Sequence, residues 1–193
     1  MIRPGIGQPV TRREDKRFLI GAGRYVDDVP VSNAAHAIVV RSPHAHAHAH
    51  VRSIDIADAQ RVEGVLAVLT GEDVAADGLG GLGIRGLPSG FGGANAVWPT
   101  RPILALGRVR YVGDPVALVI AETIEAAKDA AERVEASYDV LPAMATPDAA
   151  VSADAVAIWD EAPGNISFRH EIGDAVAVDA AMAEAKHIVE LDL

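Results

Sequence analysis

Residues 109–142, VRYVGDPVALVIAETIEAAKDAAERVEASYDVLP, contain strand, helix and strand signals that follow one another without interruption. The apolar run Pro115–Ala121, rich in β-branched residues and too short for a helix, is typical of a strand buried on both faces. Apolar residues then recur at helical spacing over Ile124–Val134, and Thr123 offers a hydroxyl for the N-cap. Alternation over Ala136–Leu141 predicts a second strand, which the next residue, a proline, ends. We therefore expect a strand–helix–strand unit.

The composition narrows the possible functions. The chain has 193 residues, half of them hydrophobic, which is enough for one well-packed domain with extensions. With 17 basic and 27 acidic side chains its formal charge is -10, so nucleic acid and anionic membranes are not expected as partners. The absence of cysteine excludes disulfides, thiolate zinc sites, iron–sulfur ligation and cysteine nucleophiles.

The first 33 residues alternate glycine, proline and charged residues, with few apolar side chains to anchor them. They are predicted to form an arm that lies over a surface. An arginine pair near the start is not followed by an apolar segment, so we expect no secretion signal. No stretch approaches the roughly 20 apolar residues of a membrane span. These features predict a cytoplasmic protein.

Between the arm and residue 109, β-type patterns predominate. Strands are predicted at Ala34–Arg41, Ala47–Ile56 and Val65–Leu69, with a short helical turn at Asp58–Val62. The composition then changes: eight of the sixteen residues from 78 to 93 are glycine, which predicts a long loop.

The start of this loop, Gly78–Gly83, matches the pattern G-x-G-x-x-G. That pattern binds a dinucleotide pyrophosphate where it joins a buried strand to the first turn of a helix. Here a polar segment that is helical or irregular precedes it, and a glycine- and proline-containing segment follows. The context therefore favours a plain loop over a dinucleotide site.

Four histidines occur at every second position: His44, His46, His48 and His50. On a strand, this spacing places the imidazoles on one face about 6 to 7 Å apart, where they could chelate a transition metal. A solvated strand face with alanines on the other side is the favoured interpretation, because no nearby carboxylate completes a metal site. Any metal bound there is expected to be adventitious and weak.

The remaining candidates for chemistry stand in no recognisable arrangement. His170 and His187 are isolated, and the sequon Asn165–Ser167 has no meaning without secretion. No serine lies in a nucleophile-elbow context; the serines considered are Ser42, Ser53, Ser89, Ser137, Ser152 and Ser167. We therefore predict no catalytic, cofactor-binding or metal-binding residue in this chain.

Short motifs nevertheless follow one another in a specific order along the chain. They are Gly7-Gln8-Pro9-Val10, Arg12-Arg13-Glu14-Asp15, Arg17-Phe18-Leu19, Gly23-Arg24-Tyr25, Asp27-Asp28, Arg41-Ser42-Pro43, Ser53-Ile54-Asp55, Ala67-Val68-Leu69-Thr70-Gly71, Val109-Arg110-Tyr111-Val112-Gly113, Pro115-Val116-Ala117, Leu141-Pro142-Ala143 and Gly173-Asp174. Together they resemble the large subunit of the molybdenum hydroxylases, the xanthine dehydrogenase and aldehyde oxidase family. The arginine-rich opening is similar to the carbon monoxide dehydrogenase branch. A two-residue insertion leaves the family's single Ala-His-Ala open between His46 and His48, and preserves strand facing.

The resemblance implies an α+β fold of the α/β-hammerhead type, with a mixed sheet and few helices. It divides the chain into an arm (1–33), the hammerhead domain (34–150) with its glycine-rich loop (78–93), and a segment (151–193) that links to a molybdopterin-binding region. That last segment is expected to contain a helix and, at Ile188–Leu193, a half-buried strand that could fray or drive self-association.

In that family, molybdenum on a pterin dithiolene hydroxylates a substrate carbon with oxygen from water, and a glutamate late in the chain acts as base. Neither the family's pterin-binding motifs nor that glutamate lies within these 193 residues. The resemblance thus implies a non-catalytic N-terminal scaffold, itself inactive and free of cofactor, of an oxidoreductase that acts on aldehydes, N-heterocycles or carbon monoxide.

The implied cofactor of the intact subunit is molybdenum–molybdopterin in its cytosine dinucleotide form. The implied partners are the remainder of the large subunit, an FAD-binding subunit and an iron–sulfur subunit. The alternative is a stand-alone binding or assembly module of the same fold without catalysis. An in-frame continuation of the gene after Leu193 favours the scaffold, whereas a stop codon followed by unrelated sequence favours the module.

Overall fold

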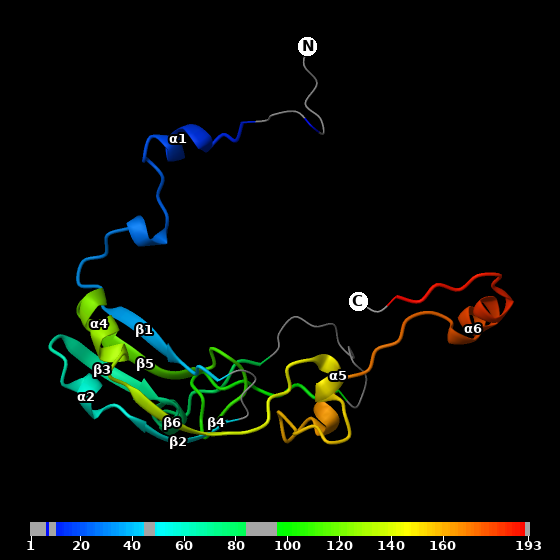
Figure 1. Cartoon of the computed structure of the whole chain (residues 1–193). Coiled ribbons are helices and arrows are strands. Elements are labelled where there is room, and N and C mark those ends of the chain that lie inside the picture. Colours follow the sequence, from blue (N-terminus) through cyan, green and yellow to red (C-terminus); the bar gives the residue numbers. More distant parts are fainter. Residues whose placement is uncertain (1–6, 8–10, 45–48, 84–95, 192–193) are drawn as a thin grey trace, which may run out of the picture. The chain divides into compact units, whose positions relative to one another are not determined.

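The computed structural model describes residue 7 and residues 11–44, 49–83 and 96–191. It divides into two compact units, residues 1–35 and 36–193. The first unit contains the short helix α1 (Asp15–Leu19) and the 3₁₀ turn η1 (Val26–Asp28), drawn in blue in Figure 1. Phe18 and Tyr25 stack in this unit with ring centroids 5.7 Å apart.

Three strands of the second unit form an antiparallel sheet in the order β1 (His36–Arg41), β5 (Pro115–Ala121) and β3 (Val65–Thr70). The central strand, β5, is hydrogen-bonded along both edges, and the side chains of Val116 and Val119 are fully buried. The apolar run Pro115–Ala121 is therefore a buried strand, as predicted.

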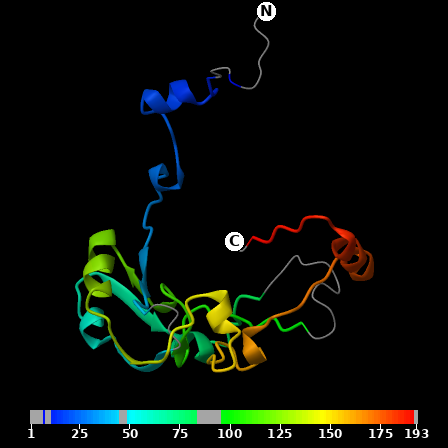
Figure 2. The ribbon, with the colours of Figure 1, turned by 45° about the vertical axis from the view of Figure 1, so that its right-hand side comes forward.

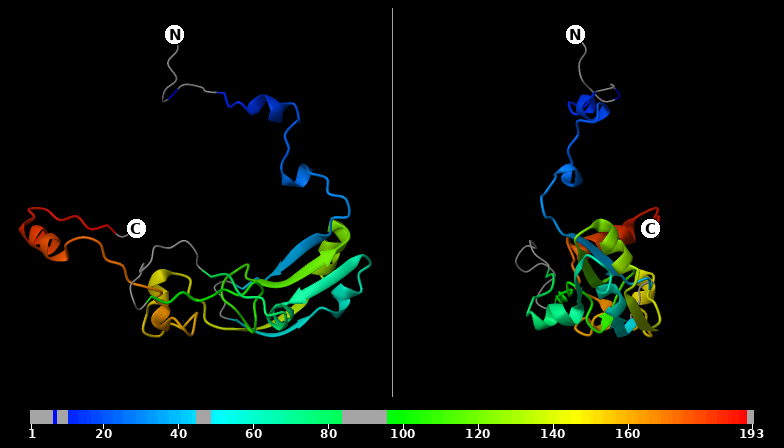
Figure 3. Two further views of the ribbon diagram at one scale, coloured as in Figure 1. Left: turned by 180° about the vertical axis from the view of Figure 1, so that it is seen from behind. Right: turned by 90° about the vertical axis from the view of Figure 1, so that its left-hand side faces the viewer.

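Three further strands form a second antiparallel sheet in the order β4 (Arg108–Val109), β2 (Ala49–Asp55) and β6 (Glu135–Val140). The two sheets run side by side in Figure 1, and Figures 2 and 3 show them from three other directions. All six described strands are thus antiparallel to their partners, so the expectation of one mixed sheet is corrected, although the α+β hammerhead class is confirmed.

Helix α4 (Ile124–Ala131) connects β5 to β6. Its N-cap is the predicted one, because the Thr123 hydroxyl accepts a hydrogen bond from the Ala126 amide at 3.1 Å. The two strands joined by this helix nevertheless lie in different sheets. Both edges of β5 are already occupied by β1 and β3, so β6 pairs with β2 instead.

The hydrophobic core has two parts. Val119 of β5 and Val68 of β3 pack with Ala130 of α4 and with Ala59 of the short helix α2 (Ala57–Gln60). On the other side, Val116 packs with Ala105, Val109 and partly buried residues of β2 and β6, namely Val51, Ile54 and Tyr138. Helices α2 and α4 thus pack on one face of sheet β1-β5-β3, and the second sheet packs on its other face. Strand β5 contributes to both parts of the core.

Helix α3 (Gly71–Ala76) follows β3 directly, and the chain after β6 forms α5 (Pro147–Ala150), the 3₁₀ turn η2 (Pro163–Asn165) and α6 (Ala175–Glu184). The predicted helix near the end of the chain is confirmed. None of the helices in the described part of the chain has the length and hydrophobicity that crossing a membrane requires.

The predicted strand at Ile188–Leu193 is wrong for the residues that the structure describes. Residues 188–191 pair with no described strand, and Val189 and Leu191 are 91% and 76% exposed. The last two residues of the predicted strand lie outside the described part. Alternation of apolar and polar residues predicts two faces, but a strand also requires a neighbouring edge that accepts its hydrogen bonds.

Candidate functional site at the junction of the two sheets

The end of β1 and the turn before β5 are bound together through backbone atoms. The Ser42 amide donates to the Asp114 carbonyl and the Gly113 amide donates to the Ser42 carbonyl, both at 2.9 Å. Arg41 adds a bond from Nη1 to the Gly113 carbonyl at 2.8 Å. Gly113 has a φ of 84°, a conformation that glycine adopts without strain. Arg41–Pro43 and Arg110–Pro115, far apart in sequence, thereby form one junction.

Asp114 places a carboxylate inside this junction, and the residue is only 6% exposed. The carboxylate accepts a hydrogen bond from the Arg110 amide at 2.9 Å. Burial raises the pKa of Asp114 above its ordinary value, and the bonds from Arg110 and from the Tyr111 hydroxyl oppose that rise. The carboxylate is held inside because two donors and nearby guanidinium groups stabilise its charge.

Ser42, His44 and Asp114 lie close together, but they do not form a catalytic triad. The Ser42 hydroxyl accepts a hydrogen bond from the His44 backbone amide at 3.3 Å, and Ser42 is 2% exposed. The His44 imidazole instead packs edge-on against Tyr138, with ring centroids 4.6 Å apart. A triad requires an accessible hydroxyl whose proton is taken by the imidazole, so this arrangement is structural.

Arg110 connects the junction to the chain after β6. Its Nε donates to the Ile158 carbonyl at 3.1 Å, and its guanidinium carbon lies 3.8 Å from the centroid of the Trp159 ring. Burial lowers the pKa of Arg110, and the like charge of Arg108 adds to this effect. Because the cation–π contact and the backbone acceptor compensate the lost hydration, the guanidinium can lie half-buried beside the indole.

Asn165 holds together residues 150–165, the segment that contains Trp159, through its side-chain amide. Its Oδ1 accepts from the Ile158 amide at 2.7 Å, while Nδ2 donates to the carbonyls of Ala150 at 2.8 Å and Val156 at 3.0 Å. The side chain that sequence analysis considered only as part of a sequon thus binds three separate backbone positions. Its φ of 57° lies in the left-handed region that asparagine tolerates better than most residues.

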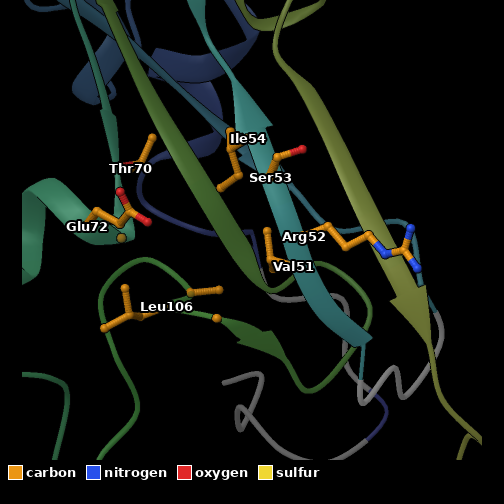
Figure 4. Close-up of a pocket in the computed structure, with 10 residues that line it drawn as sticks. Val51, Arg52, Ser53, Ile54, Thr70, Glu72 and Leu106 are labelled. Carbon is orange, nitrogen blue, oxygen red and sulfur yellow. The ribbon is translucent and has the colours of Figure 1, made fainter.

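A small hollow of about 120 Å³ lies where β2 faces the start of α3 (Figure 4). Figure 4 shows Arg52 pointing away from Glu72 and toward β6, where it pairs with Asp139 at 2.5 Å. The residues that line the hollow are Val51, Arg52, Ser53, Ile54, Thr70, Gly71, Glu72, Ala105, Leu106 and Gly107. It is smaller than the roughly 300 to 1,000 Å³ of most ligand sites, and Glu72 supplies its single carboxylate. One carboxylate without a partner base does not make a catalytic site.

Gly71 explains why this hollow is narrow. A Cβ at Gly71 would lie 2.2 Å from the Ala105 carbonyl oxygen, so the two backbones approach as closely as glycine allows. Glycine also explains part of the G-x-G-x-x-G segment: a Cβ at Gly81 would lie 2.3 Å from the Arg101 carbonyl oxygen. Leu82 and Arg101 exchange backbone hydrogen bonds of 2.6 and 3.2 Å beside it.

The structure places the helix α3, and not a buried strand, before this glycine segment. The strand–turn–helix context of a dinucleotide site is therefore missing on its N-terminal side. The rest of the glycine-rich loop, residues 84–93, lies outside the described part. Gly81, the glycine that backbone packing requires, stands at a variable position of the pattern, whereas a Cβ at Gly78, Gly80 or Gly83 would meet nothing within 4 Å.

The structure describes only two of the four alternating histidines. His44 follows β1 and His50 belongs to the backbone of β2, while His46 and His48 lie outside the described residues. Within the described residues, no group of three or more histidine, aspartate or glutamate side chains could hold a metal ion. This absence concerns direct metal ligands and not the donors of a pterin group, so the expectation of no cofactor-binding residue in the chain stays a prediction. The four-histidine interpretation itself stays a prediction.

Sequence reasoning missed the buried carboxylate of Asp114, the Arg110–Trp159 contact and the Asn165 clamp. For Asp114 there was a signal, since an acid between glycine and the proline that begins a buried strand is unusual. For the other two contacts, the fold had to bring together Arg110 with Trp159, and Asn165 with Ala150, which lie far apart in sequence.

Comparison with known proteins agrees with this fold. Residues 20–142 match the family described as aldehyde oxidase and xanthine dehydrogenase, a/b hammerhead domain. The chain belongs to this family. The hammerhead domain includes both sheets, their helices and the buried junction. The prediction drawn from the ordered motifs is therefore confirmed.

Relatives of the hammerhead domain are large subunits of molybdenum hydroxylases. The chain is 36% identical over 186 residues to the nicotine 6-hydroxylase large subunit of Paenarthrobacter nicotinovorans, covering 95% of this chain and 21% of that protein. It is 35% identical over 201 residues to the carbon monoxide dehydrogenase large chain of Afipia carboxidovorans, covering 98% and 23%. The chain thus spans about a fifth of the length of these relatives.

Solved structures give the same result. The Cu,Mo-CO dehydrogenase in its carbon monoxide reduced state matches with a TM-score of 0.72 and 32% identity, covering 95% of this chain and 23% of that chain. Quinoline 2-oxidoreductase from Pseudomonas putida 86 matches with a TM-score of 0.64 and 40% identity, covering 78% and 18%.

Proposed function

We propose that this chain is the N-terminal scaffold of a molybdenum hydroxylase large subunit, which positions the cofactor-binding remainder and takes no part in the chemistry. Two observations together carry the proposal: the similarity of the chain to molybdenum hydroxylase large subunits, and the burial of the polar groups at the junction between β1 and β5. The chain aligns along almost its whole length with a fifth of such large subunits, yet the polar groups at its junction are buried and bonded to backbone.

The proposed activity of the intact enzyme is the oxidative hydroxylation of an aldehyde, an N-heterocycle or carbon monoxide. The names of the relatives support this range, since they include a nicotine hydroxylase, a quinoline oxidoreductase and carbon monoxide dehydrogenases. Molybdenum on a molybdopterin, in its cytosine dinucleotide form, would supply the redox chemistry when bound by the remainder of the subunit. An FAD-binding subunit and an iron–sulfur subunit are the proposed electron-transfer partners.

The exposed apolar residues of the C-terminal segment support an assembly role. Within this segment, Ile172, Val176 and Val178 are largely exposed, as are the three apolar residues from 188 to 191. An apolar stretch of this size is typical of a surface that another part of a protein covers. We assign it to the cofactor-binding remainder of the same subunit.

A complementation experiment tests the proposal. Residues 1–193 are deleted from the intact large subunit, and the same residues are supplied as a separate chain during expression. We expect the shortened subunit alone to lack molybdenum and activity, and the added chain to restore both. A matched control supplies the chain with Val176→Asp and Val178→Asp, which should fold but restore less. Full activity of the shortened subunit alone would contradict the scaffold role.

A further inference from the structure

A second hollow, of about 280 Å³, lies beside the junction, since Trp159 in its wall contacts Arg110. Its walls come from the segment before β4 and from the segment after α5. The residues that line it are Pro99, Arg101, Ile158, Trp159, Ala162, Asn165 and Ser167. Most of this surface is apolar; Trp159 contributes a flat aromatic ring, and Pro99 contributes a compact saturated ring.

Contacts between backbone and side chains hold the two walls in place. The Val97 amide donates to the Ser167 carbonyl at 2.8 Å, and the Ser167 hydroxyl donates to the Val97 carbonyl at 2.6 Å. Next to this pair, the rings of Trp98 and Phe168 contact each other with centroids 4.9 Å apart. The backbone of Arg101 is fixed by its pairing with Leu82. The hollow is therefore preformed, which lowers the entropic cost of binding a ligand.

Within the described part of the chain, some of the polar side chains in the walls are already hydrogen-bonded to backbone atoms, and one is not. The Asn165 amide is bonded to three backbone positions, and the Ser167 hydroxyl donates to Val97. The Arg101 side chain is exposed, and none of the ion pairs within the described residues includes it. Its charge acts on Tyr111 and on the Asp114 carboxylate, but no ion pair with a described residue holds it in place, so its guanidinium is the donor that the hollow offers to a ligand.

A second cation lies behind the indole. The Arg110 guanidinium carbon is 3.8 Å from the centroid of the Trp159 ring and is held there by the Ile158 carbonyl. Arg101, unlike Arg110, is exposed at the hollow. Its guanidinium can form two parallel hydrogen bonds with one carboxylate, which makes Arg101 selective for planar anions.

We propose that this hollow binds a small planar aromatic carboxylate, with its ring against Pro99 and Trp159 and its carboxylate on Arg101. The volume lies near the lower limit of about 300 Å³ for ligand sites, so a single ring fits better than a fused pair. The formal charge of -10 repels anions from the chain in general, so binding must come from this local arrangement. The proposal does not rest on the scaffold role.

Titration of the whole chain with sodium benzoate, followed by two-dimensional amide NMR, tests this site. We expect saturable shifts at the Arg101 amide and at the Trp159 indole N–H. Benzamide, which has the same shape without the charge, should bind about tenfold more weakly or not at all. Sodium acetate, which has the charge without the ring, should also bind weakly.

Two arginine variants separate the site from general anion binding. Arg101→Gln should weaken benzoate binding at least about tenfold, whereas Arg101→Lys should retain part of it. The matched control is Arg133→Gln, which changes an exposed arginine just after α4 and should leave binding unchanged. The amide spectrum of each free variant shows whether it is folded. Equal binding of benzamide, or unchanged binding by a folded Arg101→Gln variant, would overturn the proposal.

Discussion

The two-sheet body and the segment after it are stabilised in different ways. In the body, six strands pair along their lengths, and the core is formed by small apolar residues on several elements. The segment from residue 141 to 168 contains only a four-residue helix and a 3₁₀ turn. It depends on a few individual contacts, above all those of Asn165, Ser167 and Arg110.

This difference determines how far the loss of stability caused by one substitution extends through the chain. In the body each residue contributes a little to a contact surface shared with many others, so the loss of one contact is distributed. In the segment one amide group makes hydrogen bonds with three backbone groups, so its loss removes all three bonds at once. The body should therefore respond to substitutions as a whole, whereas the segment should respond locally.

The largest expected effect is that of Asn165→Ala. Each backbone group left unsatisfied costs on the order of 1 kcal/mol, so the segment should lose roughly 2 to 4 kcal/mol of local stability. Hydrogen exchange should show the Ile158 amide exposed while β5 stays protected. Asn33→Ala is the matched control, because Asn33 is exposed and has the same φ of 57°. Loss of protection in β5 with Asn165→Ala would show that the two regions are not independent.

Gly71→Ala should destabilise the body by about 1 to 3 kcal/mol, because the added methyl group collides with the Ala105 carbonyl, which belongs to the backbone and cannot move aside. Urea unfolding measures the effect. Gly80→Ala is the control, since a Cβ there meets nothing within 4 Å. Equal stability of the two variants would mean that the close approach at Gly71 relaxes freely.

The two regions also differ in how well sequence predicts them. The apolar run Pro115–Ala121 predicts β5 with its observed bounds, and the periodicity after it predicts α4, which ends three residues earlier than expected, and β6, which is shifted by one residue, because burial leaves a regular pattern of apolar residues. That pattern does not encode which edge a strand pairs with, so the separation into two sheets was not predicted. The Asn165 clamp leaves no periodic pattern at all, since its acceptors and donors are set by the tertiary path of the chain. The buried Asp114 lies between two of the recognised motifs, Val109–Gly113 and Pro115–Ala117, and neither of them includes the acid.

A smaller effect tests the buried carboxylate. Because burial raises the folded-state pKa of Asp114 above its ordinary value of 3.8, the folded chain binds the proton more tightly than the unfolded chain. The stability from Asp114 should therefore be greatest below that value and should decline as pH rises toward the raised pKa. Urea midpoints of the wild type, measured against Asp114→Asn, should show this decline.

Asp73 provides a control of opposite sign. Hydrogen bonds from the Thr70 amide and hydroxyl lower the pKa of Asp73, so its contribution should be lost as pH falls through the lowered value. Asp73→Asn should therefore differ from the wild type mainly above the ordinary pKa. The same pH trend in both variants would contradict the assignment of burial as the dominant cause at Asp114.

The central claim, that this chain is a scaffold without redox chemistry of its own, is tested most directly by elemental analysis of the purified chain. The sample is produced in a host that makes the molybdenum cofactor, and is assayed for dye reduction with aldehydes, N-heterocycles and carbon monoxide. The account predicts molybdenum far below one atom per chain and no turnover, because the junction offers no accessible acid, base or metal ligand set among the described residues. Stoichiometric molybdenum, or turnover by the chain alone, would contradict it.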